Sequence, residues 1–338
     1  MTNESGAAAA TGDADPTTEP TTTDRQTGRD RTPAEGSASP NGGEPAPGGP
    51  IWLVVPALLW LGLMLRSVLV SLGSPDSGAL NVIEAAIGLP AVIAAALVGG
   101  AAVGLAVVRL AARYLSGRAS LRFTLALGAG LLTGVASAAT VINGHPTGGP
   151  EITVLGAVIA ASATIGGALS GVRASAVIAA GVAASLGVFL LTGVGALFNS
   201  ELLDLFGAAE SPLSVLEAQQ RLAWVTSGVS GLIAGLIAFG YLRQVTRSAA
   251  NPPRTPAYLA AGGGVGAMLL VTEVITRVGG SRLINLARSL SESDDLFQDL
   301  AEAARLNSAV TLFFVGALTA MISYGRTLRP TDEEPDEG

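Results

Sequence analysis

The sequence contains no cysteine and no lysine, has a single histidine, and carries charge on only 13% of its residues. Without cysteine, disulfide bonds and thiolate metal sites are excluded. A charged fraction this far below the roughly 25% of soluble domains argues against an ordinary soluble protein. The basic residues, all arginine, form no stripe interleaved with aromatic residues, so nothing supports nucleic-acid binding.

Hydrophobic residues are what the chain has in abundance, at 49% of its 338 residues. They gather in long runs that a soluble core could not absorb, so lipid is the expected solvent. The 44 glycines fit the same interpretation, because small residues let helix backbones approach closely inside a membrane. The sequence therefore predicts an all-α fold, a polytopic integral membrane helix bundle.

Eight apolar runs are each near the ~20 residues that are needed to cross a hydrocarbon core. We expect transmembrane spans at roughly 51–72, 82–108, 122–142, 151–171, 174–198, 221–242, 256–278 and 307–325. They form one transmembrane domain, 51–326. Before it, residues 1–50 are predicted to be a disordered tail, because they lack the apolar surface that would offset their ordering entropy. After it, residues 327–338 form a short acidic tail.

The formal net charge of -7 is concentrated in the two tails. Residues 1–50 hold eight acids and three arginines, and residues 327–338 hold five acids and one arginine. The membrane domain between them carries a small excess of arginine over acid. The acidity of the chain is therefore no sign of an acidic binding surface on the membrane domain.

The connections between spans alternate between arginine-rich and acidic. Arginines occur in the connections at 109–122, 173, 243–254 and 326–329, whereas acids occupy the intervening ones. The positive-inside rule places the arginine side in the cytoplasm. Both termini then lie in the cytoplasm, which is consistent with an even number of spans. We expect a multi-pass protein of the cell (plasma) membrane, embedded in the lipid bilayer.

Two of the acidic connections, 199–220 and 279–306, are long. In the second, apolar residues such as Leu296 and Leu300 follow helical spacing opposite Asp295 and Asp299. Our main interpretation is an amphipathic helix that lies on the outer leaflet. A lid or a partner-docking element is the alternative.

The chain also shows a weak internal similarity. The second span ends in Arg109-x-x-x-Arg113 and the sixth in Arg243-x-x-x-Arg247, and a glycine-rich span follows each. This pattern suggests two four-helix halves in the same orientation, 51–172 and 173–326, as in some transporters. The alternative is that positive-inside bias alone places arginine at every inner helix end.

One stretch of the sequence resembles a catalytic motif. Residues 228–231 read Gly-Val-Ser-Gly, which resembles the G-x-S-G nucleophile box of rhomboid intramembrane proteases. That chemistry needs a base to accept the serine proton, and no candidate base follows Ser230 inside a span. His145 lies upstream in a predicted connection, and one histidine without a second ligand is a poor metal site. We expect no enzyme activity, no cofactor and no metal.

Ionisable residues inside spans are the best functional candidates, because burying charge in lipid costs a few kcal/mol. Arg66, Glu84 and Glu273 qualify, and all three fall in the predicted outer half of the membrane. Arg66 and Glu84 can pair across consecutive spans, and Glu273 can pair with Arg277 one turn further on. Our hypothesis is a polar outer vestibule for an ion or an anionic small molecule. A structural salt bridge with snorkelling side chains is the alternative.

Three classes of function are compatible with this sequence. The first is a non-catalytic membrane subunit or scaffold, with a membrane-protein partner or as a homo-oligomer. The second is a secondary transporter or permease-like protein that uses the outer vestibule. A membrane-embedded enzyme ranks last, because no paired acids, metal cluster or nucleophile–base pair is expected at one depth.

Overall fold

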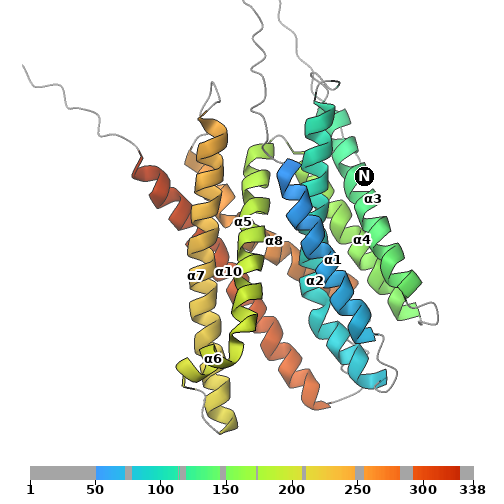
Figure 1. Ribbon diagram of the computed structural model, residues 1–338, viewed down its shortest axis with the longest axis vertical. Coiled ribbons are helices and arrows are strands. Elements are labelled where there is room, and N and C mark those ends of the chain that lie inside the picture. Colours follow the sequence, from blue (N-terminus) through green and yellow to red (C-terminus); the bar gives the residue numbers. More distant parts are fainter. Residues whose placement is uncertain are drawn as a thin grey trace, which may run out of the picture. The chain divides into compact units, whose positions relative to one another are not determined.

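The computed structural model describes residues 51–72, 78–112, 114, 119–144, 150–172, 174–207, 211–247, 255–281 and 292–327. Every regular element in these ranges is a helix (Figure 1). After a 3-10 turn (Ile51–Leu53) come α1 (Val54–Leu72), α2 (Gly78–Ala111), α3 (Ala119–Gly144), α4 (Pro150–Ser170), α5 (Ser175–Leu197), α6 (Asn199–Leu205), α7 (Pro212–Thr246), α8 (Thr255–Gly279) and α10 (Glu292–Gly325). The predicted N-terminal tail, nearly all of the acidic tail and His145 lie outside the described residues.

Eight of the described helices, all but α6, are long and apolar enough to cross a membrane. The prediction of an all-α, polytopic membrane bundle is thereby confirmed. Successive spans run in opposite directions, so the helix ends gather at two ends of the bundle (Figure 1). We call them the basic end, where Arg109, Arg122, Arg247 and Arg326 lie, and the acidic end, where Glu201 and Glu302 lie. Which end faces the cytoplasm stays a prediction.

The largest difference between a predicted span and the observed helix is at the start of α10. An amphipathic helix separate from the last span was expected within 279–306, but residues 292–306 continue without a break into that span. At a rise of 1.5 Å per residue, the 34 residues of α10 extend about 51 Å, well beyond a hydrocarbon core of ~30 Å. Acidic and basic side chains on this extension contact α8, which holds the extension in line with the span.

The start of α7 shows a second departure, nine residues before the predicted span. Ser211 is the N-cap residue, and its hydroxyl accepts a hydrogen bond of 3.3 Å from the backbone N–H of Ser214. Pro212 occupies the first turn, where its missing N–H leaves no bond unmade. These local signals begin the helix outside the apolar run, so part of the predicted 199–220 connection is helical.

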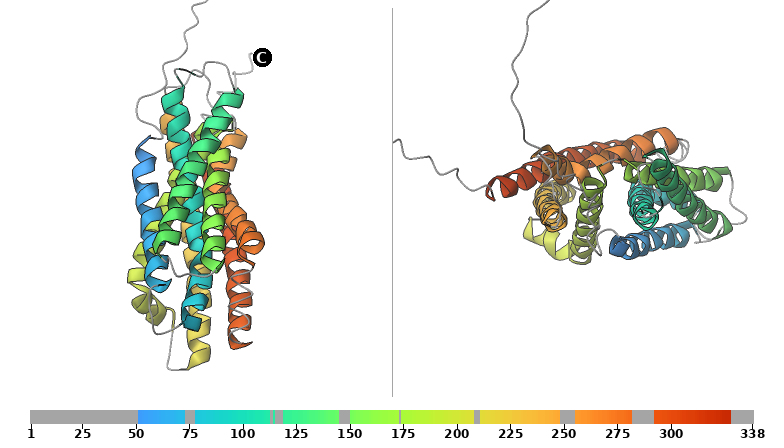
Figure 2. Two further views of the ribbon diagram at one scale, coloured as in Figure 1. Left: turned by 90° about the vertical axis from the view of Figure 1, so that its right-hand side faces the viewer. Right: turned by 90° about the horizontal axis from the view of Figure 1, so that it is seen from above.

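Glycines allow the closest helix contacts. A Cβ atom on Gly130 of α3 would lie 2.5 Å from the carbonyl oxygen of Ala163 in α4, too close for any side chain. In the same way Gly262 of α8 lies against the carbonyl oxygen of Gly316 in α10. The pairs α3–α4 and α8–α10 make the most extensive contacts in the bundle, and Figure 2 shows α8 and α10 side by side. Close backbone packing of this kind is what holds helices together in lipid.

The two halves of the chain repeat one packing pattern. In the first, α1 packs on α2, α2 on α4, and α3 on α4; in the second, α5 packs on α7, α7 on α10, and α8 on α10. The halves meet chiefly where α2 contacts α8 and α5, and where Trp60 of α1 stacks on Phe189 of α5 at 5.2 Å between ring centroids. The predicted duplication of 51–172 and 173–326 itself stays a prediction.

Candidate functional site

The candidate site is built around Glu273, which lies in the part of α8 that approaches the acidic end. Its residue exposure is 6%, so this carboxylate is buried. Thr272 and Thr276 beside it are also buried, but their hydroxyls donate to the carbonyl oxygens of Met268 and Thr272 one turn earlier, at 2.9 and 2.8 Å. The threonine hydroxyls therefore form their hydrogen bonds within α8, and the partners of the carboxylate are other side chains.

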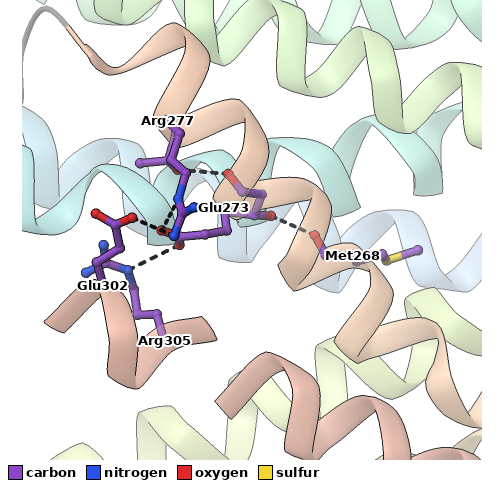
Figure 3. Close-up of polar contacts among 7 residues, drawn as sticks. Met268, Glu273, Arg277, Glu302 and Arg305 are labelled. Carbon is purple, nitrogen blue, oxygen red and sulfur yellow. Dashed lines mark hydrogen bonds and ion pairs between the residues drawn. The ribbon is translucent and has the colours of Figure 1, made fainter. Parts of the chain in front are cut away.

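Two arginines supply those partners. Arg277, one turn further along α8, has its Nε 3.7 Å from Oε1 of Glu273. Arg305 of α10 donates a hydrogen bond from Nε to Oε2 of Glu273 at 3.3 Å. Arg277 also reaches across to α10, where its Nη2 lies 2.5 Å from Oε1 of Glu302 (Figure 3). We call these four residues the Glu273 network.

The network is neutral overall and graded in exposure. Two carboxylates balance two guanidinium groups. Side-chain exposure rises from 7% at Glu273 through 29% at Glu302 and 37% at Arg305 to 50% at Arg277. A buried carboxylate without a counter-charge would be strongly unfavourable, and pairing offsets that desolvation. The arrangement therefore suits a joint that fixes the extension of α10 against α8.

One oxygen of Glu273 retains capacity for a further contact. Oε1 accepts no hydrogen bond from any described residue. The 3.7 Å separation from Arg277 is an ion pair but exceeds hydrogen-bonding distance. An ionised carboxylate oxygen can accept more than one donor, so Oε1 is the atom of this site at which a further donor or a cation could bind.

The structure bears differently on the three residues of the predicted vestibule. Glu273 is placed as described above, and its predicted ion pair with Arg277 is confirmed. Arg66 lies exposed on α1 and forms no ion pair with any described side chain. Glu84 lies on α2, but its side chain is outside the described residues. The Arg66–Glu84 pair and the three-residue vestibule stay predictions.

Sequence reasoning missed two members of the network, Glu302 and Arg305. The segment was recognised as amphipathic, but its acids were assigned to a water-facing side. A usable signal was present, because residues three apart share a helix face and place a carboxylate and a guanidinium together. What no local pattern could show is that this face meets α8.

Other chemistry suggested by the sequence finds no assembled site in the described ranges. They contain no group of three histidine, cysteine, aspartate or glutamate side chains placed to hold a metal. Ser230, from the serine box, is 2% exposed within α7. Its hydroxyl makes no hydrogen bond to any described residue, which a serine activated by a base would do.

Comparison with known proteins adds no candidate role. No protein-family model, no curated protein and no solved structure matches the chain.

Proposed function

We propose that this multi-pass membrane protein is a non-catalytic membrane subunit or scaffold, with the cell membrane as its expected location. The observation that carries the proposal is the charge balance of the Glu273 network. Each carboxylate in it faces an arginine, so the site holds no net charge with which to attract a solute ion. Its contacts join two helices, which is the geometry of a structural joint.

The packing of the bundle supports the same proposal. A Cβ atom on Gly100 of α2 would overlap the carbonyl oxygen of Ala163 in α4, and one on Gly166 of α4 would overlap the carbonyl oxygen of Leu97 in α2. Backbones in direct contact leave no space for water or a solute between these helices. A rigid, closely packed bundle is suited to presenting surfaces to other proteins.

The acidic end offers a surface for a partner. Around α6, Leu197 and Leu205 are 77% and 78% exposed, and Phe198 between them is also exposed. Leu197 ends a candidate span and can face lipid, but Phe198 and Leu205 lie beyond that span, and exposed apolar side chains there mark a contact with protein or membrane. We assign the partner contact to this α6 surface, residues 197–205.

The experiment is quantitative co-purification of the full chain from its native membranes in a mild detergent. We expect a second polypeptide in fixed ratio, retained by Glu273→Gln in the folded fraction and reduced at least tenfold by Leu205→Glu. Tyr114→Glu is the control, because Tyr114 is 89% exposed at the basic end and should leave the ratio unchanged. Equal recovery in all variants would contradict the assignment of the α6 surface.

A secondary transporter is the second candidate, favoured by one observation. Oxygen Oε1 of Glu273 is buried and has spare acceptor capacity, so it could bind a cation during a transport cycle. The scaffold proposal expects the folded Glu273→Gln variant to keep its function, whereas transport predicts that this variant loses it. Flux of a coupled ion into proteoliposomes would be abolished, whereas the amount of folded protein would be unchanged.

A further inference from the structure

A cavity of about 220 Å³ lies at the basic end, far along the helices from the Glu273 network. Residues from four helices line it: α2, α3, α5 and α7. Leu105 of α2 and Ala179 of α5 are almost fully buried and form its apolar depth. Ala112, in the turn after α2, is exposed and lies at its mouth. The cavity therefore has an apolar interior and an opening near the helix ends.

The polar part of the lining is basic. Arg109, in the last turn of α2, and Arg122, in the first turn of α3, both line the cavity and are partly buried. Ser175 and Tyr241 add hydroxyl groups. None of the described lining residues is acidic. Two guanidinium groups beside hydroxyl donors form a site for a phosphate or another oxyanion, because guanidinium matches the geometry of phosphate oxygens.

An independent feature of the backbone points to the same ligand chemistry. Helix α5 begins at Ser175, on the wall of the cavity, and the preceding residue, Ala174, provides no side-chain cap. The first N–H groups of a helix point away from it and carry the positive end of the helix dipole. Val177 and Ile178 donate their N–H groups to the Ala174 carbonyl oxygen, so an anion in the cavity would meet chiefly the positive end of the α5 dipole as well as the two arginines.

The size and position of the cavity distinguish among phosphate ligands. At about 220 Å³ it is smaller than the roughly 300–1,000 Å³ of sites that enclose a whole small molecule. Arg109 and Arg122 lie at the ends of spans, which is the depth of lipid headgroups. A phospholipid requires only its headgroup to enter, while its acyl chains remain alongside the exposed apolar surface of the helices. Basic pockets between helices at the cytoplasmic side bind such headgroups, and the basic end is the predicted cytoplasmic side.

We propose that this cavity, lined by Arg109, Arg122 and Ser175, binds the phosphate headgroup of an anionic phospholipid. The bound lipid links α2 and α3 of the first half to α5 and α7 of the second. The site goes beyond the proposed function, because it lies at the opposite end from the α6 surface and does not require a protein partner. Its failure and the failure of the scaffold proposal are therefore separately observable.

The test is native mass spectrometry of the full chain in detergent, titrated with phosphatidylglycerol or with zwitterionic phosphatidylcholine. We expect phosphatidylglycerol to bind at least tenfold more tightly. The double variant Arg109→Gln/Arg122→Gln should weaken phosphatidylglycerol binding about 25-fold, at about fivefold for each headgroup-facing arginine. The control is Arg247→Gln/Arg326→Gln, which removes the same charge from exposed positions at the same end and should leave binding within twofold.

A steric variant keeps the proposal testable if the double variant fails to fold. Ala112→Trp fills the mouth while leaving both arginines in place, and it should abolish binding. Val172→Trp is its control, because Val172 is 48% exposed at the same end and does not line the cavity.

Three results would overturn the proposal. Equal affinity for the two lipids would remove the role of headgroup charge. Unchanged phosphatidylglycerol binding in both the double-arginine and Ala112→Trp variants would remove the cavity. Thermal protection by inorganic phosphate alone, equal to that by phosphatidylglycerol, would make the ligand a soluble phosphate rather than a lipid.

Discussion

The coupling energy between Glu273 and Arg305 should exceed that between Glu217 and Arg221, although the two pairs have nearly equal lengths. Glu273–Arg305 spans 3.3 Å with side chains 7% and 37% exposed, whereas Glu217–Arg221 spans 3.4 Å with side chains 68% and 65% exposed. The N···O distances are thus matched, whereas the pairs differ in burial and in setting, since Glu217–Arg221 lies within α7 and Glu273–Arg305 joins α8 to α10. The comparison measures how far burial and setting together strengthen an ion pair in this protein.

The expected magnitudes follow from that burial. Removing one partner of a fully buried pair costs about 3–5 kcal/mol. Arg305 is more than a third exposed, so solvent screening reduces the figure, and we expect a coupling of about 1–2 kcal/mol for Glu273–Arg305. The exposed pair on α7 should contribute about 0.5 kcal/mol or less.

The assay is a double-mutant cycle for each pair, with Glu→Gln and Arg→Gln changes, read as the free energy of unfolding in mixed micelles. Raising the salt concentration should remove the coupling of Glu217–Arg221 and leave most of that of Glu273–Arg305, because partly buried pairs are screened less. Equal coupling energies for the two pairs, or a greater salt dependence of the Glu273 pair, would refute the structural role of the network.

Three further predictions concern packing, orientation and titration. Gly130→Ala should destabilise the bundle by about 1–3 kcal/mol, because its Cβ would lie 2.5 Å from a carbonyl oxygen of α4. Gly128→Ala, two residues earlier with open space around it, should be neutral or stabilising by up to about 1 kcal/mol, as read by thermal unfolding in detergent. Since the chain has no native cysteine, single cysteines report sidedness: Val172→Cys at the basic end should resist an impermeant thiol reagent in intact cells, and Ser200→Cys should react. Hydrogen bonds from its own backbone N–H and from the Ser200 hydroxyl hold the pKa of Glu201 below its ordinary value. The stabilisation is therefore present above the ordinary pKa and is lost as pH falls through the lowered one. Ser200→Ala should raise the pKa of Glu201 part of the way back, as measured by carboxyl NMR titration.

The helices could be predicted from the sequence because each span is a local property. About 20 consecutive apolar residues suffice to identify a crossing, and the structure places a long helix at every predicted run. Helices α7 and α10 begin before the predicted spans, where polar residues continue each helix. There the N-cap at Ser211 and the contacts of Glu302 with α8 decide the helix start, and hydropathy carries no information about them.

The candidate site was only half predictable for a related reason. The pair Glu273–Arg277 lies within one helix turn, so spacing alone indicates it. Arg305 approaches Glu273 from another helix, 32 residues further along the chain, and that contact depends on how α8 and α10 pack. The basic cavity is similar, because sequence places Arg109 and Arg122 at one end of the bundle but cannot show that α5 and α7 enclose them.

The subunit proposal is tested most directly by the mass of the complex that the full chain forms when it is extracted from its native membrane in mild detergent. We predict a mass above that of the chain alone, 33.6 kDa, with a second polypeptide in an integral ratio. That ratio should survive Glu273→Gln in the folded fraction and fall in Leu205→Glu. A chain that is recovered only as a monomer or as copies of itself, together with an ion flux in proteoliposomes that Glu273→Gln abolishes, would contradict the account and favour transport.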